Sequence, residues 1–134
     1  MSKSLQGGCL CGRVRFTLQE PPLRATHCHC RMCQLAAGAP FVTWAVVRQA
    51  DFSWTLGEPR LFPSSDLAER GFCAACGTAL TFRFLNENNE IDIAAVCFDD
   101  PDIIEPLDHI WTKTRPEWIK LSDGLPEHKG KRDG

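Results

Sequence analysis

The 134-residue sequence lacks any long apolar run, and no segment approaches the ~20 apolar residues needed to cross a bilayer. Its first eight residues also lack an apolar segment of signal-peptide length. Because cytoplasmic thiols are kept reduced, the eight cysteines and the missing leader together lead us to expect a cytoplasmic protein, with no membrane as partner.

The chain also lacks a large excess of positive or negative charge. The formal net charge of −2 gives no electrostatic argument for a nucleic-acid partner, and the basic residues Lys129, Lys131 and Arg132 predict a solvated tail. The hydrophobic fraction of 43% and the charged fraction of 24% are ordinary for a soluble globular protein.

Internal repeats, low-complexity runs and interdomain linkers are absent, so residues 1–134 are most simply a single domain. Apolar residues alternate with a period of two or form short β-rich runs, separated by breaks that include residues 63–65. Short helical turns are expected at residues 31–37 and from Pro116 to Gly124. The prediction is therefore a mainly β, antiparallel domain with one or two short helical turns. The expected strands are residues 14–18, 41–47, 52–56, 79–84 and 91–96.

Seven of the eight cysteines gather in three clusters, Cys9-Leu-Cys11, Cys28-His-Cys30-Arg-Met-Cys33 and Cys73-Ala-Ala-Cys76. These spacings let neighbouring thiolates converge on one tetrahedral ion. Four disulfides in a secreted protein are the alternative, but the tight spacing and the missing leader favour zinc. Seven ligands divide into a closed set of four and a set of three that leaves one coordination position open.

The set of four is expected to combine Cys73 and Cys76 with Cys9 and Cys11. Cys73-Ala-Ala-Cys76-Gly77 is a zinc knuckle, in which Gly77 permits a tight turn with backbone N–H groups aimed at sulfur. A knuckle supplies two ligands and needs a second pair. Closing the chain between the two pairs costs about 4 kcal/mol, whereas structural zinc contributes about 10–16 kcal/mol.

The remaining trio, Cys28, Cys30 and Cys33, is compact enough to bind one ion and leave its fourth position open. We expect the side chain of His29 to point away from that ion, and the distant Cys97 to be a core thiol in a strand. The alternative is a closed site, completed by His27, His29 or Cys97.

An open zinc with three thiolates is a weak Lewis acid, but it is thiophilic and can hold an incoming thiol as thiolate. A thiolate held beside a small carbonyl compound is arranged for addition, which gives a hemithioacetal, or for the reverse step. Backbone N–H groups at residues 38–41 are a candidate source of carbonyl polarisation.

With these clusters and their flanks, the chain resembles the glutathione-dependent formaldehyde-activating enzyme family, which includes the centromere protein V group. The resemblance spans about Gly7 to Pro126. Its most specific stretches are His-Cys-His-Cys-Arg-Met-Cys at 27–33 and Arg-Gly-Phe-Cys-Ala-Ala-Cys-Gly-Thr at 70–78. The other matching stretches are residues 7–16, 38–41, 109–111, 116–118 and 123–126.

The resemblance implies a β-tent fold with two zinc ions per chain, of which the second is loosely bound. It implies a structural zinc at Cys9, Cys11, Cys73 and Cys76, and a catalytic zinc at Cys28, Cys30 and Cys33. The family activity is that of a carbon–sulfur lyase, which joins glutathione and formaldehyde to S-(hydroxymethyl)glutathione or releases them. Gln34 and Ala37 replace a basic residue and a serine that many relatives carry, which weakens the transfer of the substrate.

Other residues have two interpretations each. Arg70 could bind a substrate carboxylate or pair with Asp66 or Glu69, and His109 could contact substrate or make a structural hydrogen bond. Ser64 and Ser65 are most simply turn residues, with a polar rim of the site as the second option. Four tryptophans could wall a pocket or pack in the core: Trp44, Trp54, Trp111 and Trp118.

We therefore predict a zinc enzyme that forms or cleaves an adduct of a small-molecule thiol and an aldehyde, plausibly glutathione and formaldehyde. Arg70 and His109 are its candidate substrate contacts, and a homo-oligomer is left open. The alternative is a non-catalytic zinc-binding module with a structural or protein-interaction role, because one fold can carry unrelated functions.

Overall fold

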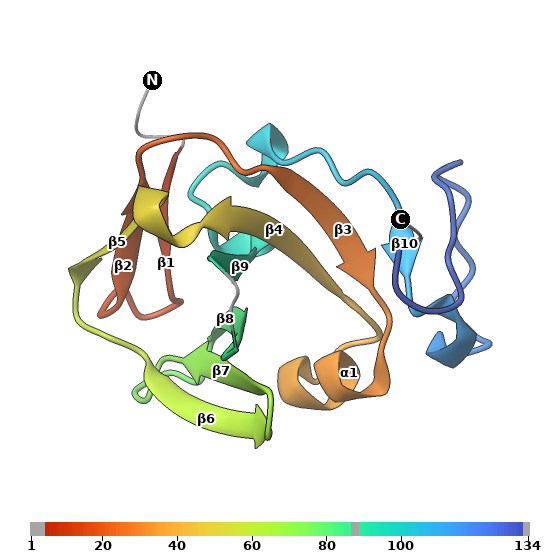
Figure 1. Cartoon of the computed structure of the whole chain (residues 1–134), viewed down its shortest axis with the longest axis horizontal. Coiled ribbons are helices and arrows are strands. Elements are labelled where there is room, and N and C mark those ends of the chain that lie inside the picture. The colour runs from red at the N-terminus through yellow and green to blue at the C-terminus, as the bar shows by residue number, and fades with distance from the viewer. Residues whose placement is uncertain (1–4, 87–88, 133–134) are drawn as a thin grey trace.

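The computed structural model describes residues 5–86 and 89–132, and within them the chain forms two β-sheets and one α-helix (Figure 1). The smaller sheet has the order β1-β2-β5, with β1 (Gln6–Gly8), β2 (Arg15–Leu18) and β5 (Phe52–Leu56). The larger sheet has the order β10-β3-β4-β9-β8-β7-β6. Its strands are β3 (Arg24–Cys28), β4 (Val42–Arg48), β6 (Arg60–Ser65), β7 (Ala68–Phe72), β8 (Ala79–Phe84), β9 (Glu90–Ala94) and β10 (His109–Ile110).

The main core lies between the two sheets, because alternate side chains of β2, β4 and β9 point into it. Phe16 on β2 is 1% exposed and packs edge-to-face against Phe98. Gly7 on β1 allows the close approach of the two layers, since a Cβ there would collide with the carbonyl oxygen of Cys97. The opposite face of the larger sheet carries Trp44 and is covered in part by α1 (Arg31–Ala37). The buried core residues are Phe16, Leu18, Ala45, Val47, Ile93 and Phe98.

The prediction of a mainly β chain is confirmed, and all five expected strand regions contain a strand. The expected break at residues 63–65 is wrong, because Pro63 lies inside β6. β6 is an edge strand, where a missing backbone donor is tolerated. The sheet is also not wholly antiparallel, since β10 runs parallel to β3. The region expected as a strand at 91–96 ends early, and residues Ala95–Cys97 form the 3₁₀ turn η3.

The first expected helix is present as α1. Cys30 caps its start by accepting a hydrogen bond at Sγ from the N–H of Cys33 (3.3 Å), and Gly38 ends it at φ 64°. The second expected helix is wrong. The structure has only a single turn there, with the N–H of Ile119 bonded to the carbonyl of Pro116. Trp118 is 72% exposed, so this short segment lacks the packing that a helix of its length needs.

The helices of the described part of the chain are all too short or too polar to cross a membrane. The largest of them, α1, has seven residues.

The C-terminal segment returns beside β10, so the prediction of a merely solvated tail is wrong for Arg132 (Figure 1). The N–H of His128 donates to the carbonyl of His109, and that of Trp111 donates to the carbonyl of Gly130 (both 2.9 Å). Arg132 then pairs with the buried Asp108, with Nη2 2.8 Å from Oδ1. Since a buried carboxylate needs partners, this ion pair anchors the segment.

Substituting Arg132→Ala should lower the free energy of unfolding at pH 7 by about 1–3 kcal/mol, because Asp108 then loses a charged hydrogen-bond donor. The Arg132 guanidinium, helped by the hydroxyl of Thr26, holds the pKa of Asp108 at about 2. A lowered carboxyl pKa stabilises the fold above the ordinary value of 3.8, and this contribution fades as the pH falls towards 2. The difference between wild type and variant should therefore shrink as the pH falls through the acid range towards 2.

Urea unfolding of the two proteins measures this difference. Lys131→Ala is the matched control, because Lys131 is an exposed basic residue next to Arg132. Equal destabilisation by both substitutions would contradict the assigned role of the ion pair.

Candidate functional site

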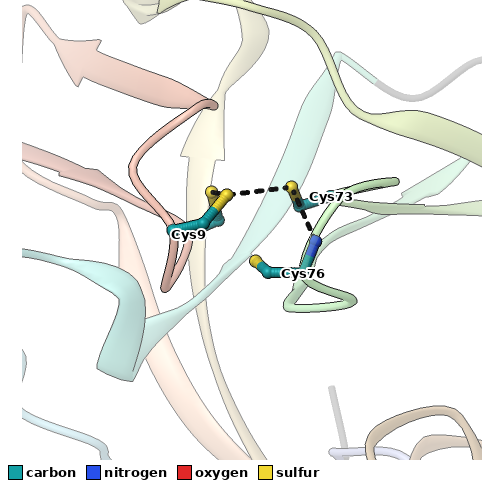
Figure 2. Close-up of side chains that lie close together, drawn as sticks. Cys9, Cys73 and Cys76 are labelled. Atoms are coloured by element: carbon teal, nitrogen blue, oxygen red, sulfur yellow. Dashed lines mark hydrogen bonds between the residues drawn. The ribbon is translucent and has the colours of Figure 1, made fainter.

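Four cysteines from two distant segments converge at one end of the larger sheet. Figure 2 shows Cys9, from the loop after β1, facing Cys73 and Cys76 on the turn after β7. Cys11 completes the group, with its Sγ 3.7 Å from that of Cys9 and 3.8 Å from that of Cys73. A disulfide would bring two sulfurs to about 2.05 Å. A tetrahedral ion with metal–sulfur bonds of about 2.3 Å separates its ligands by about 3.8 Å. We call this group the quartet, and its sulfur spacing fits a metal ion.

The backbone around the quartet stabilises thiolates. The N–H of Cys76 points at the Sγ of Cys73, and the N–H of Val14 points at that of Cys9 (both 3.4 Å). The knuckle turn continues through Gly77, whose φ of 83° favours glycine. Hydrogen bonds from the hydroxyl and backbone of Thr78 lower the pKa of Cys76 to about 5. An anionic sulfur is the form that binds metals, so the surroundings of Cys76 agree with the spacing.

The second group is the trio of Cys28, Cys30 and Cys33. Cys28 ends β3, Cys30 caps α1, and Cys33 lies in the first turn of that helix. The Sγ atoms of Cys28 and Cys33 are 3.7 Å apart, and all three lie within 4.8 Å of one another. This spacing also fits the edge of a tetrahedron around a metal. The trio could therefore hold a metal as well.

Within the described residues, no fourth Cys, His, Asp or Glu ligand atom lies within 4.8 Å of all three sulfurs of the trio. The three candidates for closing the site are engaged elsewhere. His27 is hydrogen-bonded to Thr43 (2.8 Å), and His29 to His109 (2.9 Å). Cys97 is half-buried in η3, with its Sγ 3.6 Å from the carbonyl of Ala79. The coordination offered by the chain is thus three sulfurs.

The thiols of the trio differ in pKa. Hydrogen bonds with Cys30 and Cys33, together with burial, raise the pKa of Cys28. Hydrogen bonds from Cys28 and Cys33 lower that of Cys30 well below its ordinary value. Cys30 is thus the sulfur that carries negative charge first.

Arg70 on β7 lies against the trio. Its Nη1 and Nη2 are 3.7 and 3.6 Å from the Sγ of Cys33, and its guanidinium stacks on Phe82 at 4.8 Å. Glu69, which the sequence offered as a surface partner, pairs instead with Arg83 (2.9 Å). Arg70 therefore places a positive charge beside the trio.

His109 is 1% exposed and lies in a hydrogen-bonded chain. Its Nε2 is 2.8 Å from the carboxylate of Asp123, and its Nδ1 is 2.9 Å from the Nε2 of His29. The pKa of Asp123 is lowered by the N–H of Leu125 and by His109, so the carboxylate accepts and His109 Nε2 donates. His109 Nδ1 then accepts a hydrogen bond from His29. Both ring nitrogens of His109 are engaged, and neither cavity described below is lined by it.

The imidazole ring of His27 stacks on that of His109, with ring centroids 4.6 Å apart and ring planes inclined by 25°. Ligand atoms of His27, His109 and Asp123 lie within 4.8 Å of one another. Lone pairs of imidazole lie in the ring plane, so two nearly parallel rings do not converge on one ion. This group fits a hydrogen-bonded network better than a metal site.

Two cavities flank the trio. The first, of about 440 Å³, has the buried Cys33 in its lining, and the second, of about 420 Å³, has Cys30. They share Met32, Ser64 and Arg70 in their linings. Figure 1 shows α1 beside the end of β6, and both elements contribute to the first cavity. The trio therefore has access to two separate spaces that meet at Arg70.

Sequence reasoning missed part of these walls. Ser64 was expected to form a turn, yet it lies in β6 and lines both cavities, as the polar-rim option proposed. No sequence pattern singles out Asp92 on β9, which lines neither cavity and whose pKa is raised to about 7 by burial. The N–H groups of Gly38 and Ala39 both bond to the carbonyl of Gln34, so the expectation that they polarise a carbonyl is wrong.

The four tryptophans separate into different roles. Trp44 lines the first cavity and Trp111 the second. Trp54 packs against Phe16 beside the main core, and Trp118 is exposed. Two of the four tryptophans thus wall the cavities beside the trio.

Known proteins resemble this chain in sequence and in fold. The sequence model of the family described as glutathione-dependent formaldehyde-activating enzyme matches residues 4–114. An uncharacterised lyase of Schizosaccharomyces pombe is 33% identical over 95 residues, which cover 69% of this chain and 67% of the relative. A Halomonas elongata protein, provisionally named a glutathione-dependent formaldehyde-activating enzyme, is 26% identical over 127 residues, covering 87% of this chain and 80% of that protein.

Among solved structures, a crystal structure of a Rhodobacter sphaeroides protein matches with a TM-score of 0.57 and 22% identity. The match covers 75% of this chain and 96% of that one, and it supports the fold alone. The match to the family model extends over most of the chain and contains both cysteine groups. The chain belongs to the glutathione-dependent formaldehyde-activating enzyme family.

Proposed function

We propose that this protein is a zinc-dependent carbon–sulfur lyase that forms or cleaves the adduct of a thiol and an aldehyde at the trio. Glutathione and formaldehyde are the first substrates to test, because the family and one relative carry those names. The observation that carries the proposal is the trio itself. Its sulfurs have the spacing of metal ligands, no fourth ligand from the described residues, and a cavity on each side.

In this proposal the quartet holds a structural zinc and the trio a catalytic zinc, two ions per chain. Zinc bound at the trio would supply a thiophilic Lewis acid that lowers the pKa of an incoming thiol. Addition forms one bond between the thiol sulfur and the carbonyl carbon, and the thiol proton ends on the carbonyl oxygen. Cleavage reverses both changes, and neither direction needs an oxidant or reductant.

Side chains of the protein would contact the substrate and stabilise the charge that develops on it. Arg70 lines both cavities and contacts Cys33, so its charge faces the place where negative charge develops on the carbonyl oxygen. Ser64 lines both cavities beside Arg70 and offers a hydroxyl. We propose Arg70 as a substrate contact, and we assign buried His109 a positioning role. Such a reaction suits the reducing cytoplasm, where free thiols are abundant.

With both metal sites loaded, the protein should accelerate the equilibration of glutathione and formaldehyde above the uncatalysed rate. Cys28→Ser should remove at least nine-tenths of this acceleration, because the trio loses a ligand. Exchange spectroscopy with ¹³C-formaldehyde measures the rate at equilibrium. Cys97→Ser is the matched control, since Cys97 belongs to neither cysteine group, and its activity should equal that of wild type. An unchanged background rate with the loaded wild-type protein would refute glutathione and formaldehyde as the substrate pair.

Metal counting separates the enzyme from a non-catalytic zinc module. Cys28→Ser should keep one zinc and a cooperative unfolding transition. Cys76→Ser should lose cooperative unfolding, because structural zinc contributes about 10–16 kcal/mol. Elemental analysis and thermal unfolding of both variants give the answer. If Cys28→Ser instead lost cooperative unfolding, the trio would be a structural site and the enzymatic proposal would fail.

His109→Ala should lower the free energy of unfolding by about 1–3 kcal/mol, because the buried Nε2–H of His29 loses its acceptor. In the His109→Ala variant, zinc should also leave the trio faster than it does in the wild type, relative to zinc in the quartet, since His29 lies between Cys28 and Cys30. Urea unfolding and chelator competition measure these effects. His109→Gln, which keeps one side-chain acceptor, should recover part of the loss. A raised KM with unchanged stability and unchanged zinc release would instead make His109 a substrate contact.

A further inference from the structure

We infer that the first cavity selects aldehydes that carry an apolar chain or ring, in preference to formaldehyde. The inference rests on the proposed thiol–aldehyde reaction and concerns the substrate class at the same site. It is carried by the lining of the two cavities, their size and two buried polar atoms at their junction.

The first cavity is lined mainly by apolar side chains. Among the described residues that line it, Arg70 is the only charged one. Such a wall favours an apolar group, because burying one removes its surface from water, whereas a carboxylate buried there would lack partners beyond Arg70. Its apolar residues come from α1, β4, β6, β7 and β8: Met32, Leu35, Ala36, Ala37, Val42, Trp44, Phe62, Phe72 and Ala79.

The second cavity is also mostly apolar, with Leu67, Phe82, Phe84 and Trp111 in its wall, but it carries more positive charge than the first. Three cations line it, Arg31, Arg70 and Lys113, and the described part of its lining contains no acidic residue. A thiol that carries carboxylates, as glutathione does, fits this side by charge. The anionic thiol and the apolar aldehyde are thus assigned to opposite sides of the trio.

Two buried polar atoms lie where the cavities meet. The Oγ of Ser64 and the Nε of Arg70 are buried and have no hydrogen-bond partner in the described residues. Both residues line both cavities. Buried polar atoms are normally paired, so a turn of either side chain towards the cavities would give its atom a partner in a ligand oxygen. The carbonyl oxygen of an aldehyde, or the hydroxyl of its adduct, is such an oxygen.

Size separates formaldehyde from larger aldehydes. Formaldehyde has two heavy atoms and would leave most of a 440 Å³ cavity without contacts. Ligand sites of about 300–1,000 Å³ hold molecules much larger than that. An aldehyde whose oxygen meets Ser64 and Arg70 extends its substituent between α1 and β6, where it contacts Phe62 and Met32.

The test compares formaldehyde, propanal, butanal and hexanal with glutathione as the thiol, using zinc-loaded protein. Each added methylene that enters the cavity should raise kcat/KM by about fourfold, the ratio that corresponds to about 0.8 kcal/mol. Ala36→Leu fills the first cavity from α1 with a good helix former. It should lower kcat/KM for hexanal at least ten times more than that for formaldehyde. Ala50→Leu, at an exposed position outside both cavities, should change neither value.

A binding measurement keeps this inference separate from the proposed reaction. Ligand-detected NMR with the unreactive alcohols 1-propanol, 1-butanol and 1-hexanol should show affinity that rises with chain length and is lost in Ala36→Leu. If the alcohols show this binding pattern but no aldehyde is turned over, the proposed reaction is refuted, whereas the assignment of the first cavity as an apolar binding site is supported. If formaldehyde is turned over without any gain from chain length, or Ala36→Leu slows all aldehydes equally, the inference is overturned.

Discussion

Convergence of thiolates is the interaction on which the rest of this structure depends. Cys9 and Cys11 lie more than sixty positions before Cys73 and Cys76, yet their sulfurs meet at metal-ligand spacing. Four thiolates at such distances would repel one another, and a cation bound at their centre would remove that repulsion. The contact joins the loop after β1, in the smaller sheet, to the turn after β7, in the larger one. It therefore fixes the smaller sheet against the edge where β6 and β7 form the wall of the first cavity.

The larger sheet then places the chemistry on one of its faces. Its strand register aligns Arg70, Phe82 and Asp92 across β7, β8 and β9, and residues paired in this way project from the same side. Trp44 and Cys28 lie on that side too, together with α1. The opposite side carries the apolar core under the smaller sheet. One face thus provides stability and the other is available for the site.

Much of this arrangement could be predicted from the sequence, because cysteine spacing is a local property. The Cys73–Cys76 knuckle, the compact trio and the alternation of β2 each depend on residues a few positions apart. The cavities could not be predicted, since they depend on the packing of β6 against α1, and Pro63 argued against a strand there. The anchoring of Arg132 was missed for a similar reason. A basic residue near the terminus is usually solvated, and only the fold places the buried Asp108 within its reach.

The shortness of α1 has a mechanical consequence. Its seven residues carry Cys33 together with Met32, Leu35 and Ala36, which line the first cavity. Two turns of helix move as one rigid unit, so a guest that pushes on these walls also displaces a metal-binding sulfur. Through α1, occupancy of the first cavity is therefore linked to the affinity of the trio for a metal ion.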